Sequence, residues 1–205
     1  MAEAGRATAR FGAILLFLGA LAGCGRTFQV RVERQVEQPA EWVVAVLPLD
    51  DSGAEGAIRD YAVAGRAGAR GSGALFARSI SRAVAANVRF RSIDEAALRD
   101  LMLDEKLTSA ELSRVDDARA AELGRELGAN LVVLGRVVTF ERSWFLFMPR
   151  TTVLLELRGL DLATGETIWN ATLGDSSTSR SEATLFSRIG GAGLRAIAEG
   201  VGAPQ

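Results

Sequence analysis

The start of the chain limits how much of it can fold as a globular domain. Arg6 and Arg10 precede an apolar run over residues 11–23, and small residues end this run ahead of Cys24, the single cysteine of the chain. A basic start, a short apolar middle and a small-residue exit are typical of a secretory signal. A helix over this run would be about 20 Å long at about 1.5 Å per residue, too short for a hydrocarbon core of about 30 Å. We therefore expect a removed signal rather than a transmembrane helix.

The exit of this run resembles the lipobox of bacterial lipoproteins. A lipobox places an aliphatic residue and two small residues directly before a cysteine, and Leu21, Ala22 and Gly23 match that pattern. The resemblance implies that a peptidase removes the signal peptide, residues 1–23, and that the sulfur of Cys24 carries diacylglycerol. The alternative is an ordinary cleaved signal followed by a buried cysteine.

A lipid on Cys24 would anchor the mature chain to a membrane. Each buried methylene contributes about 0.8 kcal/mol and one acyl chain binds only marginally, so a multiply acylated cysteine, palmitate included, is a stable anchor. Gly25 stands where an aspartate would favour the inner membrane of enteric bacteria. The resemblance therefore favours the outer membrane, with the domain facing the periplasm.

The composition excludes several classes of function. The chain has no histidine, which excludes Ser-His-Asp and Cys-His catalysis and removes the usual zinc ligands. The formal net charge is −1 without a basic block, so nothing indicates nucleic-acid binding. With its one cysteine committed to lipid, the chain has no disulfide, and we expect no catalytic residue, metal or cofactor. Hydrophobic residues make up 48% of the chain, which is typical of a packed core.

Residue patterns downstream of the signal predict one α/β domain. Alternating or continuous apolar residues predict strands, and apolar residues at helical spacing predict helices. The predicted strands are 27–37, 43–49, 90–93, 130–141, 151–162 and 167–173, and the predicted helices are 74–88, 95–106, 116–128 and 182–201. The segment 24–41 is then membrane-proximal with a possible edge strand. The domain 42–205 has the order βαβααβββα, a mixed sheet flanked by helices in a three-layer-like arrangement.

Three stretches of this domain carry a family resemblance. The stretches are 43–50, 122–136 and 160–169. They resemble, in that order, an opening strand, a helix with the central strand after it, and a Thr-Gly-Glu hairpin. These elements belong to the bacterial lipoproteins related to the curli-secretion channel CsgG, the penicillin-binding-protein activator LpoB and the amino-terminal domain of TolB. Gly165 suits a turn position with positive φ, and Trp169 can pack one face of the meander. The resemblance implies the fold and the setting in the envelope rather than an active site.

Two groups of residues are candidates for chemistry. The glycine-rich segment 65–73 precedes a helix and can cradle an anion, although a flexible lead-in to that helix is the favoured interpretation. Asp50, Asp51 and Asp60 can act as acid and base or hold a divalent ion, although such residues more often end strands and solvate loops.

The segment 142–150 is the candidate interaction site. It joins the two longest predicted strands, where turns are normally polar. Instead, five apolar residues lie between Arg142 and Arg150, and they are Trp144, Phe145, Leu146, Phe147 and Met148. Such a tip can sit in a bilayer interface or in a groove of a partner. The alternative is that it folds back over the sheet and joins the core.

The predicted function is a lipid-anchored, non-enzymatic lipoprotein that binds protein partners in envelope assembly or secretion, with homo-oligomers allowed by the resemblance. One alternative is a subunit of a curli-type secretion channel, but the chain offers at most one membrane hairpin, 130–162, which Arg136 and Arg158 interrupt. Another is a regulator of peptidoglycan synthases, which reaches its target through a long linker. Here the segment from Cys24 to Trp42 spans only about 60 Å when fully stretched.

Overall fold

The structure is a computed structural model that describes residues 26–35, 39, 41–56, 71–145, 148–177 and 182–202. The predicted lipobox and Cys24 lie outside the described residues. Asp60 and residues 65–70 of the glycine-rich segment also lie outside the described residues. Side chains are not described at positions 142–149, so the segment 142–150 is placed by its backbone pairing alone.

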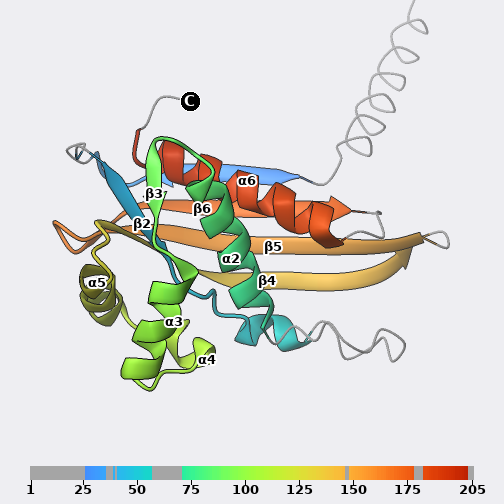
Figure 1. Cartoon of the computed structure of the whole chain (residues 1–205). Helices are drawn as coiled ribbons and strands as arrows, with labels where there is room; N and C mark the ends of the chain where they lie inside the picture. Colours follow the sequence, from blue (N-terminus) through green and yellow to red (C-terminus); the bar gives the residue numbers. More distant parts are fainter. Residues whose placement is uncertain are drawn as a thin grey trace, which may run out of the picture.

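Six strands form one mixed sheet in the order β1–β6–β5–β4–β2–β3 (Figure 1). Their bounds are β1 Thr27–Val32, β2 Trp42–Val46, β3 Phe90–Ser92, β4 Leu131–Phe145, β5 Met148–Asp161 and β6 Glu166–Ser177. Neighbours in the β1–β6–β5–β4 half are antiparallel, whereas β2 is parallel to both β3 and β4. The mixed sheet and the meander of β4, β5 and β6 confirm the predicted fold class.

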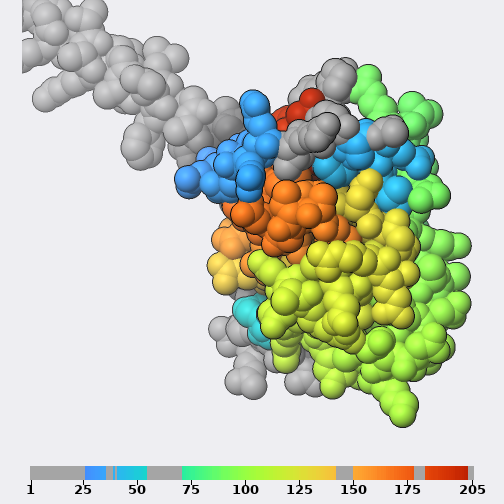
Figure 2. All heavy atoms as spheres, turned by 90° about the vertical axis from the view of Figure 1, so that its left-hand side faces the viewer, coloured from blue at the N-terminus to red at the C-terminus, as the bar shows by residue number. Residues whose placement is uncertain are grey.

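Helices cover both faces of this sheet. The helices α2 (Ser72–Ala85) and α6 (Glu182–Gly200) lie side by side on one face (Figure 1). The other face carries α3 (Glu95–Asp104), α4 (Ser109–Leu112) and α5 (Asp117–Glu126), and a short 3-10 helix, η1 (Ser52–Gly56), follows β2. Figure 2 looks onto the end of the sheet opposite the β4–β5 turn and shows orange β6 residues between blue β1 and the yellow-green helical layer.

The parallel half of the sheet is buried on both faces. Val44 and Val46 belong to the core under α2 and α6, while Ala45 and Leu47 belong to the core under α3, α4 and α5. Continuous apolar runs are typical of such strands because side chains alternate between two covered faces. This explains why the residues after position 42 lack polar alternation.

Local signals place most of the element ends. Asp94 and Asp116 cap α3 and α5 by accepting hydrogen bonds from the backbone N–H groups of Ala96 and Arg119. Gly128 and Gly165 have φ of 71° and 74°, as their predicted helix-end and turn positions require.

Several details differ from the sequence prediction. Strand β4 runs to Phe145 and β5 starts at Met148, so most of the predicted turn 142–150 is paired strand, because the β4–β5 ladder continues to its end. Helix α3 ends at Asp104 rather than at Lys106, which has φ of 55° and turns the chain away. Helical spacing over 74–88 predicts Leu75 and Val88 on the buried side of the helix. Both are exposed, because Leu75 lies off the buried stripe of α2 and Val88 lies beyond its last residue. Helix α4 was not predicted, although its capping box of Thr108 and Glu111 is a readable signal.

Glycines in α6 allow that helix to pack directly on α2. A Cβ on Gly190 would lie 2.5 Å from the carbonyl oxygen of Ser79, and a Cβ on Gly193 would lie 2.7 Å from Cγ1 of Ile80. A Cβ on the exposed Gly191 would meet no atom within 4 Å. The two helices therefore approach too closely for a side chain at position 190.

We predict opposite effects for two neighbouring alanine substitutions in α6. Gly190→Ala should lower the free energy of unfolding by about 1–3 kcal/mol, because the new methyl group overpacks against rigid backbone. Gly191→Ala should raise it by about 0.5–1 kcal/mol through helix propensity alone. Urea denaturation followed by circular dichroism measures both. Equal effects would contradict the close packing of α2 and α6.

Candidate functional site

The described part of the glycine-rich segment is occupied by an internal carboxylate. Asp51 Oδ2 accepts hydrogen bonds from the backbone N–H groups of Gly71 at 2.7 Å and of Gly73 at 3.2 Å. These N–H groups lie at the start of α2, where an external anion would otherwise bind. A Cβ on Gly73 would lie 1.8 Å from the carbonyl oxygen of Leu49, so this close approach requires glycine. The geometry favours a helix lead-in over an anion cradle.

Asp50 is also engaged by neighbours within the fold. Its Oδ1 accepts hydrogen bonds from the Ser52 N–H at 3.1 Å and from Nε of Arg114 at 3.3 Å. Partial burial raises the pKa of the Asp50 carboxyl, but the hydrogen bonds from Ser52 and Arg114 outweigh burial and hold that pKa below its ordinary value. Within the described ranges, no three His, Cys, Asp or Glu side chains gather closely enough to hold a metal ion.

We predict that Asp51 stabilises the fold as a helix cap. Asp51→Ala should lower the free energy of unfolding by about 0.5–2 kcal/mol, the usual cost of losing a capping side chain. Asp100→Ala, which removes an exposed carboxylate from α3, is the matched control and should change stability by less than about 0.5 kcal/mol. Thermal or urea unfolding measures the difference. Equal values for the two variants would show that the hydrogen bonds of Asp51 contribute nothing.

The predicted interaction segment continues the hairpin of β4 and β5. The two strands stay paired to the end, with Trp144 opposite Pro149 and Phe145 opposite Met148. Leu146 and Phe147, at the turn, lie outside the described residues. The backbone pairing places the segment at the far end of the hairpin. The exposure of its side chains stays a prediction.

The first strand starts at the same end of the sheet as this hairpin turn. Thr27 is opposite Gly174 on β6, Gly174 is opposite Leu154 on β5, and Leu154 is opposite Thr139 on β4. Because β1 runs antiparallel to β6, its first residue faces the turn and its last residue faces away from it. Figure 1 shows that β1 starts on the side on which β4 and β5 meet. The first residue of β1 therefore lies toward the hairpin end of the sheet.

The arginines that interrupt the predicted membrane hairpin are both paired with acids. Arg136 donates to Glu156 across the β4–β5 pair at 2.7 Å, and Arg158 donates to Asp117 of α5 at 2.5 Å. The pairing with Glu156 raises the pKa of Arg136, and Arg158 connects the sheet to the helical layer beneath it. None of the helices within the described ranges is long and apolar enough to cross a membrane.

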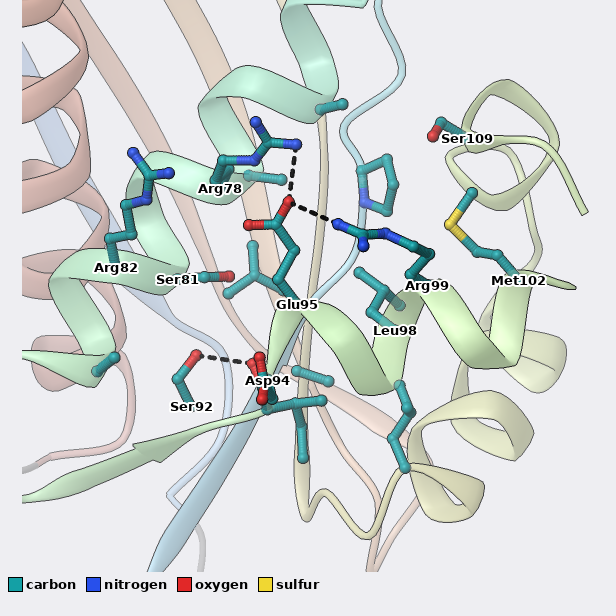
Figure 3. A pocket seen from close by; sticks show the side chains of 18 residues that line it. Arg78, Ser81, Arg82, Ser92, Asp94, Glu95, Leu98, Arg99, Met102 and Ser109 are labelled. Atoms are coloured by element: carbon teal, nitrogen blue, oxygen red, sulfur yellow. Dashed lines mark hydrogen bonds and ion pairs between the residues drawn. The ribbon is translucent and has the colours of Figure 1, made fainter.

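A cleft of about 560 Å³ lies between α2 and α3 (Figure 3). Residues after β2 and β3 form its floor, including Pro48 and Ile93. One wall is the face of α2 with Ala77 and Ser81, and the other is the face of α3 with Leu98 and Met102. Three arginines from these helices surround the opening, and they are Arg78, Arg82 and Arg99.

The sheet topology explains why the cleft lies there. The chain leaves β2 through α2 on one face to reach β3, and it leaves β3 through α3 and α5 on the other face to reach β4. Helices that depart to opposite faces from adjacent parallel strands leave a crevice outside the carboxyl ends of those strands, where ligands commonly bind. The sequence alone does not predict this site, because its walls come from separate helices. The small residues Ala74, Ala77, Ser81 and Ala85 on one face of α2 were the available signal.

The charges at the cleft are unevenly paired. Glu95 contacts Arg78 across the cleft at 2.8 Å and Arg99 on its own helix at 3.8 Å (Figure 3). Asp94 accepts the N–H of Ala96 as the cap of α3. The guanidinium of Arg82 makes no hydrogen bond or ion pair with the described residues and lines the cleft.

Comparison with known proteins shows similarity in fold alone. No protein-family model and no curated protein sequence matches the chain. Among solved structures it is similar to the PelC dodecamer from Paraburkholderia phytofirmans, with 17% identity over 87% of this chain and 100% of that chain and a TM-score of 0.51. It is also similar to lipoprotein GNA1162 from Neisseria meningitidis (21% identity, 77% and 99% coverage, TM-score 0.49) and to the LpoB C-terminal domain from Salmonella enterica (16%, 68% and 86%, 0.45).

The PelC similarity covers nearly the whole domain and supports the fold described above. LpoB, to which the sequence shows a resemblance, is among the similar solved structures. The expected resemblances to the curli channel and to TolB stay predictions.

Proposed function

We propose that the mature chain is a non-enzymatic lipoprotein of the bacterial cell envelope that binds other envelope proteins while lipid on Cys24 holds it at a membrane. The short apolar run, the lipobox pattern and the absence of histidine support this proposal at the level of sequence. The outer membrane, with the domain on its periplasmic side, is the favoured location. The position of β1 is the single structural observation that carries the proposal.

β1 makes the tether between anchor and domain short. Three Cα–Cα steps separate Cys24 from Thr27, so the anchor lies within about 11 Å of the first residue of the sheet. The strand pairs with β6 over its full length, and Arg26 lies 3.8 Å from the buried carboxylate of Asp175. A lipid on Cys24 therefore keeps the domain against the membrane. This weakens the alternative of a regulator that reaches across the cell wall.

The hairpin end then faces the same membrane. Six residue steps along β4 separate Thr139, which is level with Thr27, from Phe145, a distance of about 20 Å at about 3.3 Å per residue. The hairpin end therefore reaches about 9 Å further toward the membrane than the tether does. Apolar groups lie at a similar depth, about 5–10 Å, in a bilayer interface. We propose that the apolar segment from Trp144 to Met148 inserts into that interface as a second contact.

Assembly with further copies is a part of the proposal. The solved PelC structure is a dodecamer and spans nearly the whole of this fold. A lipid anchor and a hairpin end on the same side would place every copy of a ring in one orientation to the membrane. Native mass spectrometry of the lipoprotein in detergent would show the number of chains.

We predict that Cys24 is processed and acylated. The intact mass of the protein purified from its own membranes should equal that of the chain from Cys24 plus diacylglycerol and a further acyl chain. Cys24→Ser should retain residues 1–23, since the peptidase acts before a lipidated cysteine. An unprocessed amino terminus or a free thiol in the native protein would overturn the anchor.

We predict that Trp144 contacts lipid and that the other two tryptophans do not. Trp42 and Trp169 are 5% and 0% exposed, so a bilayer cannot reach them. In vesicles that contain brominated phosphatidylcholine, the lipoprotein should lose the fluorescence of one tryptophan, and Trp144→Phe should remove this quenching.

Val88→Ser, at a fully exposed position beyond α2, is the control and should leave the quenching unchanged. If Trp144 is not quenched although Cys24 is acylated, the tip binds protein or folds onto the sheet, and the bilayer contact is wrong.

A further inference from the structure

We propose that the cleft between α2 and α3 binds an acidic, apolar peptide segment of a partner protein. This inference deepens the proposed function, because it assigns the partner-binding site to a place and a chemistry. It concerns residues distant from both the anchor and the hairpin turn in sequence.

The shape of the cleft suits a short peptide. Ala74 and Ala85 mark its extent along α2, about 17 Å at about 1.5 Å per residue. An extended segment of five residues has the same length at about 3.3 Å per residue. Between these alanines the α2 wall carries the small side chains of Ala77 and Ser81 beside the two arginines, which leaves space for side chains of the ligand.

The α3 wall supplies apolar surface that the fold itself does not cover. Leu101 is the buried residue of α3, whereas Leu98 and Met102 are half-buried and face the cleft. Methionine adapts its shape to different apolar partners, and such side chains are common at peptide-binding surfaces. Two or three aliphatic side chains of a peptide would complete the burial of this wall.

The charge at the opening selects a carboxylate. Arg78 and Arg99 already share Glu95, whereas Arg82 has no ion pair with the described residues. Arg78, Arg82 and Arg99 outnumber Asp94 and Glu95, so the described lining carries a net positive charge that repels a basic peptide. A carboxylate of an acidic peptide can accept paired hydrogen bonds from Arg82 without displacing Glu95.

A display experiment on the intact lipoprotein tests the proposal. A phage library of random octapeptides is selected on the full mature protein immobilised in detergent, and the enriched peptides are synthesised for isothermal titration calorimetry. Enriched peptides should combine aliphatic residues with Asp or Glu. Arg82→Gln should weaken their binding about five- to tenfold, and a peptide with Gln and Asn in place of its acids should lose the same factor.

Two further variants make the outcome decisive. Ser81→Leu fills the middle of the cleft and should abolish peptide binding, with thermal unfolding as the check that the fold is intact. Arg89→Gln removes an exposed arginine outside the cleft and should leave the affinity unchanged. Equal losses from Arg82→Gln and Arg89→Gln would show general electrostatic attraction and overturn the site.

Other occupants are outcomes of the same experiment. No enriched peptide, or peptides that bind Ser81→Leu as well as the natural chain, would overturn the proposal. If Ser81→Leu instead dissociates an oligomer seen by native mass spectrometry, the cleft is an interface between copies and the peptide site is wrong. These results are independent of Cys24 acylation, so a failed cleft and a failed membrane anchor are distinguishable.

Discussion

The burial of β2 and β4 on both faces is the constraint on which the rest of the structure depends. Stability has to come from packing, because the chain has no histidine for a metal site and its one cysteine cannot form an internal disulfide. A strand such as β2, apolar at every position, needs a helix above and a helix below. The connections that supply those helices leave to opposite faces, and the crevice between α2 and α3 is the geometric result.

The antiparallel half of the sheet is covered by α6 on one face. At the end where β5 turns into β6, Trp169 fills the space between β5 and α6. A Cβ on Gly159 would lie 2.1 Å from Nε1 of Trp169, and a Cβ on Gly200 would lie 2.3 Å from its Cδ1. This completely buried indole joins β5, β6 and the last residue of α6 at the end opposite the hairpin turn. The hairpin end is then free to extend beyond the helices, as a membrane contact requires.

Much of the fold was predictable because its signals are local. The strands of the meander, the glycine turns at Gly128 and Gly165 and the caps at Asp94 and Asp116 depend on residues within a few positions of each other. The prediction failed where contacts between residues far apart in the chain decide which side chains are buried. Leu75 has the apolar character of a core residue, but its position on α2 turns it away from the core formed by Phe76 and Ile80. The cleft was unpredictable for the same reason, since Arg82 and Met102 line one cleft only after α2 and α3 have packed onto the sheet.

By itself, the sequence determined the prediction of a signal, the cysteine that matches a lipobox and the exclusion of histidine chemistry, since each depends on residue identity and short spacing. The tertiary structure alone decided that the start of β1 and the turn between β4 and β5 lie at one end of the sheet. It also decided that three arginines surround one crevice. Strand register and helix placement join residues far apart in the chain, and they are set by which packing buries the most apolar surface.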